Sequence, residues 1–313
     1  MLLNANIYTE LFYRQYNMFQ ILKYSYYALF SITALLINSA IVFLPVVFFS
    51  LIKIIVPIKS IKYHCTTIVQ GLASFWVSFA IMITELFSPT EIEFEQNAEI
   101  NKKDTYLVIS NHKSWLDTLI LMLAFHKKIP FPKFFMKSQM FFVPLIGMVC
   151  WALEFPAMKR YSKGYIAKHP EKKGEDIEMT KKYCQNLSDR PTTIVNFVEG
   201  TRYTKEKAIN SQYSNLLNPK AGGIAVILKS LSDKMVGVLN TTIVYDNPNQ
   251  TLWDFMIRKT KKIKVKVDFI PIVDVPLGDY FNCPKDKQAF QEWLNNLWAN
   301  KDKYIETKLS NIN

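Results

Sequence analysis

The chain has 313 residues and a formal net charge of +12, from 38 lysines and arginines against 26 aspartates and glutamates. Its residues are 50% hydrophobic and 14% aromatic, a composition that excludes a disordered chain and allows a sizeable core. The positive excess favours anionic partners, namely phospholipid head groups, phosphorylated small molecules or nucleic acid, and charge alone does not choose among them.

Two long runs near the N-terminus contain no Asp, Glu, Lys or Arg. The first extends from Tyr24 to Ile52 and the second from Tyr63 to Thr84. A helix needs roughly 20 apolar residues to span a bilayer, so each run is long enough. The first run is too long, and starts too late, for a cleaved signal peptide. A pair of buried helices in a soluble protein is the alternative.

The connector between these runs is basic and contains Lys53, Lys59 and Lys62. If both runs crossed the bilayer, the connector would lie opposite the rest of the chain, against the positive-inside tendency. Pro45 offers a place for a kink in the first run. We therefore predict that residues 1–88 form a membrane-associated helical pair, at least one member of which is embedded without crossing.

Residues 89–313 show the pattern of an α/β domain. Buried strands are predicted at 105–110, 192–198 and 236–245, and a half-exposed strand at 262–269, where lysines alternate with aliphatic residues. Helices are predicted at 116–125, 139–153 (interrupted by Pro144), 221–231 and 286–309. Strands that alternate with helices imply a largely parallel or mixed sheet with helices packed on it.

The strand predicted at 105–110 leads directly into Asn111-His112, and Asp117 follows five residues after His112. Ser114 and Asp117 have the spacing of a capping box, which predicts that a helix starts at Ser114. His112 then lies just outside the helix and Asp117 in its first turn, where the two side chains can meet. A neutral imidazole held by a carboxylate is a general base near neutral pH. Alternatively, Asp117 serves only as the capping partner of Ser114.

The stretch "NFVEGTRYT", 196–204, ends another predicted strand. Gly200 permits a tight turn, and Arg202 offers a planar fork suited to a phosphate. Glu199 does not favour an anion, so we expect it to orient Arg202 or to hydrogen-bond a substrate hydroxyl.

Two weaker signals are also basic or rich in glycine. "EFPAMKR", 154–160, places Lys159 and Arg160 after an apolar segment, and "NPKAGG", 218–223, has the features of a helix start whose amides receive an anion. Singly, a basic pair is usually solvated and a glycine pair is usually a turn. It is their order along the chain that is specific.

The blocks "NHKSWLD", "AMKR" and "FVEGTR", in that order, resemble the glycerolipid acyltransferases, the 1-acylglycerol-3-phosphate and lysophospholipid acyltransferase superfamily. The resemblance covers roughly residues 60 to 275, and the paired blocks are highly specific. The strings "RYSKGYIAKHP", "PTTIVNFVEGTR" and "NPKAGG" look most like a bacterial inner-membrane branch of this superfamily.

The resemblance implies that His112 deprotonates the free glycerol hydroxyl of a lysophospholipid and that Asp117 orients His112. The hydroxyl then attacks the thioester carbonyl of acyl-CoA or acyl-carrier protein, with no covalent acyl-enzyme, cofactor or metal. Further residues that the resemblance assigns to the phosphate and glycerol of the acceptor are Arg160, Glu199, Gly200, Thr201 and Arg202, with Lys159 in a lesser role.

The resemblance also implies a fold, partners and a location. The fold is a mixed α/β sheet flanked by helices, residues 89–313, beside an N-terminal membrane-embedded helical pair, residues 1–88. The partners are a lysophospholipid, most directly 1-acylglycerol-3-phosphate, an acyl thioester and membrane lipids, with no nucleic acid. The location is a bacterial inner membrane with the catalytic domain facing the cytoplasm. Val198 stands where many members have proline, and "NTTIVYD", 240–246, replaces a proline-containing fourth block, which leaves the acceptor open.

Two other functions are considered. A phosphoesterase would usually need a second histidine or metal ligands, and the other histidines lie in unrelated places along the chain. A non-catalytic, membrane-tethered basic module could bind lipid through "RKTKKIKVK", 258–266, whose alternation instead indicates a strand at a sheet edge with a solvated face. Nucleic-acid binding would need aromatic residues interleaved with these lysines. The four cysteines form no CxxC pair and are expected to be unpaired thiols.

Overall fold

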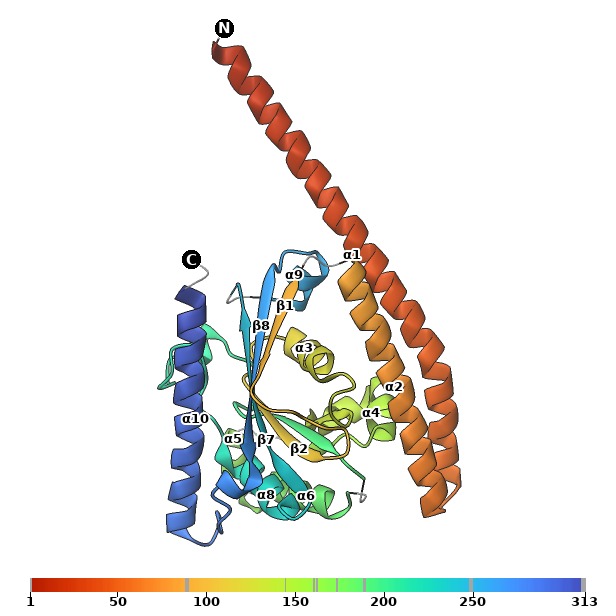
Figure 1. Ribbon diagram of the computed structural model, residues 1–313, viewed down its shortest axis with the longest axis vertical. Helices are drawn as coiled ribbons and strands as arrows, with labels where there is room; N and C mark the ends of the chain where they lie inside the picture. Colours follow the sequence, from red (N-terminus) through yellow and green to blue (C-terminus); the bar gives the residue numbers. More distant parts are fainter. Residues whose placement is uncertain are drawn as a thin grey trace.

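The computed structural model describes residues 2–87, 90–143, 145–159, 161, 163–172, 174–187, 190–247 and 250–310. Two long N-terminal helices, α1 (Leu2–Ile55) and α2 (Lys59–Phe87), run antiparallel along one side of an α/β domain (Figure 1). α1 continues through Pro45 and ends two residues before Pro57, where the backbone cannot continue as a helix. The predicted pair of apolar helices is confirmed.

Within the described residues, two helical stretches have the length and composition to cross a membrane. They are Met18–Ile55 and Lys59–Leu86. Many of their large apolar side chains are exposed.

The centre of the α/β domain is a mixed sheet, as predicted. Its strand order is β1-β8-β7-β2-β6-β3, and every neighbouring pair is parallel except β7 with β8. The strands are β1 (Glu91–Gln96), β2 (Thr105–Ser110), β3 (Pro132–Phe134), β6 (Thr193–Phe197), β7 (Met235–Tyr245) and β8 (Lys262–Pro271). A separate two-stranded sheet joins β4 (Met136–Lys137) to β5 (Ala157–Met158).

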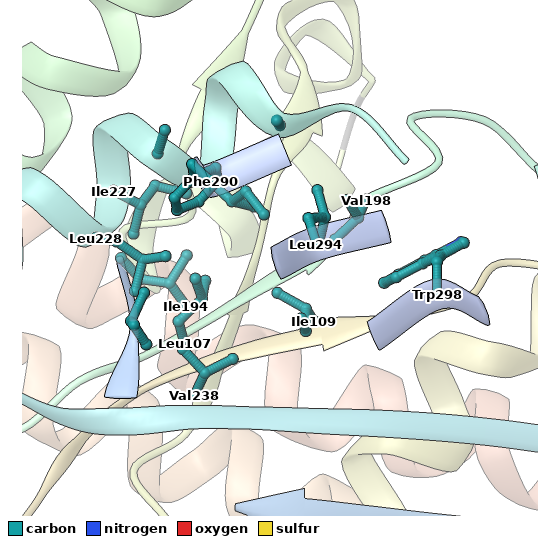
Figure 2. Close-up of a cluster of buried hydrophobic side chains, with 14 of the residues drawn as sticks. Leu107, Ile109, Ile194, Val198, Ile227, Leu228, Val238, Phe290, Leu294 and Trp298 are labelled. Carbon is teal, nitrogen blue, oxygen red and sulfur yellow. The ribbon is translucent and has the colours of Figure 1, made fainter. Parts of the chain in front are cut away.

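Successive side chains of β2 point to opposite faces of the sheet, and each face has its own core. Leu107 and Ile109 join one cluster with helices α6 (Glu175–Gln185), α8 (Ala221–Leu231) and α10 (Pro284–Ser310). Figure 2 shows this cluster, with strand residues meeting the large side chains of α8 and α10. Tyr106 and Val108 join the other cluster with α3 (Leu116–Phe125), on the side of α1 and α2.

The remaining helical segments are short. They are α4 (Ile146–Ala152), α5 (Lys163–Lys168), α7 (Lys205–Ala208) and α9 (Leu252–Met256), with 3-10 turns η1 (Ser138–Phe142), η2 (Pro170–Lys172) and η3 (Ile272–Asp274). The helix predicted at 139–153 is therefore two pieces, η1 and α4, separated where Leu145 has a φ of 66°. Pro144, to which the interruption was attributed, lies outside the described residues.

The strand β8 has the predicted alternation but not the predicted position. Its aliphatic residues are buried and its lysines are partly exposed. However, β8 lies between β1 and β7, and β1 forms the sheet edge. The Nζ of Lys264 lies 3.1 Å from a carboxylate oxygen of Glu93 on β1, and Lys262 also pairs with Glu93. The expectation of an edge strand with freely solvated lysines is wrong, because these lysines face the glutamates of a further strand.

Glu154 links the helical pair to the α/β domain. Its Oε1 accepts hydrogen bonds from Lys53 Nζ of α1 and Thr66 Oγ1 of α2, both at 2.9 Å, and its Oε2 accepts one from Lys133 Nζ of β3 at 3.2 Å. Burial acts to raise the pKa of Glu154, but the charges of Lys133 and Lys53 outweigh it and lower the pKa to about 2. The side chain of Lys133 is 1% exposed, so Glu154 supplies the negative charge that this buried ammonium requires.

Replacing Glu154 by alanine is expected to lower the free energy of unfolding by about 3–5 kcal/mol, because the charge of Lys133 stays buried without a counter-ion. Denaturant unfolding of the full chain in detergent micelles measures this. Glu171→Ala, which removes an exposed carboxylate, is the control and should change stability little. Adding Lys133→Met to Glu154→Ala should recover part of the loss. Equal stability of the two glutamate variants would contradict this account of Glu154.

Candidate active site

Two of the sequence blocks singled out above, "NHKSWLD" and "FVEGTR", meet at the carboxyl ends of β2 and β6. These two strands are parallel neighbours, so the segments that follow them emerge side by side. The backbone N–H of Tyr203 donates to the carbonyl oxygen of His112 at 2.7 Å, and the N–H of His112 donates to Glu199 Oε1 at 3.1 Å. This edge of an α/β sheet is where ligands commonly bind.

The side chains of His112 and Asp117 are in contact, with Nδ1 of the imidazole 2.8 Å from Oδ2 of the carboxylate. A carboxylate only accepts hydrogen bonds, so Nδ1 carries the proton and Nε2 presents a lone pair. The predicted contact is therefore present. A general base with a fixed tautomer requires this arrangement.

Asp117 is fully buried and is held by several donors besides His112. Its Oδ2 accepts from the backbone N–H groups of Lys113 at 2.6 Å and Ser114 at 2.8 Å, and its Oδ1 accepts from the hydroxyl of Tyr245 at 2.5 Å. The orientation of this carboxylate is thus fixed from both the β2–α3 turn and β7.

The helix α3 has the predicted span, Leu116–Phe125. It does not start at Ser114, as the capping-box spacing alone suggested, although Ser114 Oγ accepts from the N–H of Leu116 at 3.2 Å. Asp117 Oδ2 accepts the N–H of Ser114, so one half of the predicted capping box is present; the other half is not, because the N–H of Asp117 donates to the backbone carbonyl of Ser114 and not to its hydroxyl. Asp117 therefore contacts both the turn at the start of α3 and the ring of His112, and both contacts use the same oxygen, Oδ2.

The imidazole of His112 is stacked on the ring of Phe197, with centroids 3.9 Å apart and ring planes 13° apart. The side chain of His112 remains 16% exposed. Phe197 thus supports one face of the ring and leaves part of it open to a ligand.

Glu199 is buried, and both of its carboxylate oxygens accept backbone N–H groups. Oε1 takes that of His112, and Oε2 takes that of Leu217 at 3.1 Å. Burial raises the pKa of Glu199 to about 8, although the two N–H donors act to lower it. The expectation that Glu199 orients Arg202 needs correction, because its carboxylate instead joins the His112 turn to the loop that contains Leu217.

The C-terminal helix α10 supports the same region from the opposite face of the sheet. The ammonium of Lys301 is buried and donates to the carbonyl oxygen of Thr241, and burial lowers the pKa of Lys301 to about 7. The carboxylate of Asp302 accepts the N–H groups of Ser214 at 2.9 Å and Asn215 at 2.7 Å. α10 therefore holds the loop from which Leu217 reaches Glu199.

The turn after Glu199 brings cations together. Gly200 has a φ of 73°, the left-handed conformation that the tight turn required, and a Cβ at this position would lie 2.8 Å from Nζ of Lys220. The guanidinium of Arg202 lies 4.7 Å from the ring centroid of Trp115. Lys207 Nζ donates to Thr201 Oγ1 at 2.8 Å. Lys220, at the start of α8, is a cation that the sequence reasoning did not assign to the site.

The described residues of the segment 154–160 make contacts elsewhere in the fold, not with His112 or Asp117. Lys159 follows β5 and forms an ion pair with Glu175 of α6 at 2.7 Å. Within the described part of the chain, Lys159 forms its hydrogen bond and ion pair with Glu175 and not with Asp117. Arg160 lies outside the described residues, so its predicted role stays a prediction.

An apolar cavity of about 500 Å³ opens between the helical pair and α3. Trp115 and Thr118, at the start of α3, form part of its wall, and they are the lining residues closest to His112 in the sequence. Its other walls come from α1, α2 and α9, and include Leu35, Trp76 and Phe255. Within the described part of the chain, His, Cys, Asp and Glu side chains form no group of three that could hold a metal ion.

Comparison with known proteins places this geometry in a family. A family model described as "Acyltransferase" matches residues 91–245, from the first residue of β1 to the last of β7. The 1-acyl-sn-glycerol-3-phosphate acyltransferase gamma of Homo sapiens is 26% identical over 247 residues, which cover 73% of this chain and 60% of that protein. The chain belongs to the 1-acylglycerol-3-phosphate acyltransferase superfamily.

Other relatives agree with this membership. The 1-acyl-sn-glycerol-3-phosphate acyltransferase 3 of Arabidopsis thaliana is 23% identical over 67% of this chain and 55% of that protein. A 2-acyl-1-lysophosphatidylinositol acyltransferase of Saccharomyces cerevisiae is 26% identical over 37% of this chain and 32% of that protein. The chain thus spans about 60% of the length of the first curated relatives. The crystal structure of the 1-acyl-sn-glycerophosphate acyltransferase of Thermotoga maritima superimposes with a TM-score of 0.43 at 15% identity, covering 85% of this chain and 98% of that one.

Two residues that hold this site together were not identified from the sequence. Tyr245 donates to Asp117 from within a strand whose apolar run indicated only burial. Asn111 exchanges two hydrogen bonds of 2.9 Å with the backbone of Ile243, which locks the end of β2 to β7. Asn111 could have been found, because an amide beside His112 at the end of a buried strand needs partners for its donor and its acceptor.

The elevated pKa of Glu199 predicts how stability depends on pH. Because the folded-state pKa lies above the unfolded value, the contribution of the protonated group is fully present below about pH 4 and is lost as the pH rises through 8. In Glu199→Gln this loss is absent, so wild type should lose stability relative to the variant between pH 5 and pH 8, by at most about 1.4 kcal/mol per pH unit. Denaturant unfolding at several pH values measures the difference in slope. Glu306→Gln, exposed on α10, should run parallel to wild type, and parallel curves for Glu199→Gln would contradict a raised pKa.

Proposed function

We propose that this acyltransferase moves a fatty acyl group from a thioester to the free hydroxyl of a lysophospholipid, most directly 1-acylglycerol-3-phosphate. The observation that carries the proposal is the 2.8 Å contact between His112 Nδ1 and the buried Asp117, beside a turn rich in cations. The relatives described above, whose names give acylglycerol phosphate or lysophosphatidylinositol as the substrate, support the acceptor class.

The proton transfer follows from the tautomer. Nε2 of His112 takes the proton from the acceptor hydroxyl as its oxygen attacks the carbonyl carbon of the thioester. Asp117 stabilises the imidazolium that forms. When the carbon–sulfur bond breaks, the imidazolium returns the proton to the leaving sulfur, which gives a free thiol and a new ester. The reaction uses a general base and no covalent acyl-enzyme, and the thiol leaves from either acyl-CoA or acyl-carrier protein.

The acceptor phosphate is assigned to the turn formed by Glu199, Gly200, Thr201 and Arg202. Arg202 provides a planar guanidinium, and the ammonium of Lys220 lies against Gly200. Lys113 adds a third positive charge next to His112. Burial lowers the pKa of Lys113, although the carboxylates of Glu199 and Asp117 act in the opposite direction. Glu199 contributes through the backbone it holds, and Arg160 and Lys159 remain candidates for the outer part of the acceptor site.

An acyl chain fits the apolar cavity between α3 and the helical pair. Its volume of about 500 Å³ lies within the usual range for ligand pockets, and aromatic and aliphatic side chains line it. Because Ser31, Leu35 and Trp76 of the helical pair form part of the wall, a chain could enter from the bilayer without passing through water. Residues 1–88 then act as the membrane part and residues 89–313 as the catalytic domain.

We place the protein at the cytoplasmic face of a bacterial inner membrane, on the basis of the resemblance described above. A pair embedded in one leaflet keeps the basic connector, which contains Lys59 and Lys62, on the same side as the domain. Lys262 and Lys264 of β8 are paired with Glu93 of β1, and Lys266 is paired with Asp268, so these lysines offer less free positive charge to a non-catalytic lipid-binding role than the sequence suggested.

His112→Ala is expected to lower the rate of acyl transfer by about 10²–10⁴-fold, the usual contribution of a general base, while lysophospholipid binding persists. Acyl-CoA consumption by purified protein, offered a panel of lysophospholipids, measures the rate. His169→Ala, an exposed histidine, is the matched control and should keep full activity. Normal turnover by His112→Ala would exclude His112 as the general base, and no turnover by the wild-type protein would favour the non-catalytic lipid-binding module.

Arg202→Ala is expected to raise the apparent KM for a phosphorylated acceptor by about tenfold or more, since a hydrogen bond to a charged group contributes about 1.5–3 kcal/mol. The KM for the acyl thioester should not change. Lys205→Ala removes one positive charge three residues away and serves as the control. If both variants raise the KM equally, the effect is one of general charge and Arg202 has no specific role.

A further inference from the structure

The segment from Ser138 to Leu153, which comprises η1 and α4, has a composition unlike the rest of the α/β domain. It contains no charged residue, and Lys137 and Glu154 flank it. We call it the apolar hairpin. Its large hydrophobic side chains that are exposed are Phe142, Val143, Leu145, Ile146, Met148 and Trp151. Soluble domains rarely expose so many apolar side chains in one short segment.

The exposure of these side chains is not the result of a loose segment. Gly147, Cys150 and Ala152 of α4 are buried. A Cβ at Gly147 would lie 2.0 Å from the carbonyl oxygen of Phe141, so only glycine allows η1 and α4 to pack this closely. One side of the hairpin therefore packs on the rest of the protein. The other side has a defined structure, but no other described residues cover it.

The covered side of the apolar hairpin packs on the helical pair. Ala152 and Leu153 form a small core with Val42 and Val46 of α1 and Val69 of α2. The ammonium of Lys53 donates to the carbonyl oxygen of Ala152 at 3.3 Å and lies 5.3 Å from the ring centroid of Trp151. The hairpin therefore lies beside the C-terminal half of α1, at the same level along the helix axis.

The part of α1 beside the hairpin also exposes apolar side chains, on a different side of the helix from Val42 and Val46, which pack on the hairpin. Leu44 is 72% exposed, and Phe48 and Leu51 are also exposed. A lipid phase that covers these side chains of α1 extends over the neighbouring hairpin as well. A protein partner would have to cover α1 and the hairpin together.

We propose that the apolar hairpin is a third membrane-embedded element, inserted among the acyl chains of the same leaflet as α1 and α2. This inference rests on the membrane association proposed above. Three embedded elements, α1, α2 and the apolar hairpin, fix both the depth and the tilt of the α/β domain at the membrane, which the helical pair alone would not do. The height of His112 above the lipid is then set by the fold.

The test uses single cysteines that carry an environment-sensitive NBD fluorophore in the full chain. Cys283→Ser removes the one native cysteine that is not buried, and this protein without an added cysteine gives the background labelling. Cysteines replace Phe142 or Met148 in the hairpin, Leu44 in α1 as a reference, and Ile209, which is 79% exposed in the domain, as a control. The proteins are reconstituted into phosphatidylcholine and phosphatidylglycerol vesicles with and without nitroxide-labelled lipid.

The labels at positions 142 and 148 should lose as much emission to the nitroxide lipid as the label at 44, and the label at 209 should lose none. If the labels at 142 and 148 behave like that at 209 while that at 44 is quenched, the hairpin proposal fails and membrane association stands. If no label is quenched, membrane association itself fails. A blue shift at 142 and 148 that appears in detergent only at high protein concentration, with no quenching in vesicles, would assign the hairpin to contact with a second copy and overturn the proposal.

Discussion

The carboxylate of Asp117 is the group on which the geometry of the site depends. It is fully buried, and it accepts hydrogen bonds from the imidazole of His112, two backbone N–H groups of the preceding turn and the hydroxyl of Tyr245. A buried carboxylate is tolerable only with such a set of donors. The same interactions that make its burial possible also fix the turn before α3 and the tautomer of His112, so folding of this turn and orientation of the imidazole are one event.

A second buried carboxylate, Glu199, performs a different task because its partners differ. Its donors are backbone N–H groups, and among them is that of His112 itself. Asp117 therefore positions the ring of His112 and Glu199 positions its main chain. The family match ends at Tyr245, whereas the loop that completes the shell of Glu199 is held by Asp302 of α10. Part of the framework of this site thus comes from a helix outside the segment that defines the family.

The sequence predicted the elements whose signals are local. Continuous apolar runs predicted β2, β6 and β7, the alternation of lysine with aliphatic residues predicted β8, and the spacing of His112 and Asp117 predicted their contact. The parts that it did not predict depend on distant contacts. Tyr245 lies 128 residues from Asp117, and nothing in its strand distinguishes a side chain that meets a carboxylate from one that fills the core. The short strands β1 and β3 carry charged residues and form only because a neighbouring strand supplies hydrogen bonds and, for β1, lysines to its glutamates.

The position of α10 has a consequence for the order of events during synthesis. α1 and α2 are synthesised before α10, which places Lys301 beneath Thr241 and Asp302 against the amides of Ser214 and Asn215. The loop that completes the surroundings of Glu199 therefore has no support until α10 has been made. A nascent chain presents its two apolar helices to its surroundings before the region around Glu199 is complete.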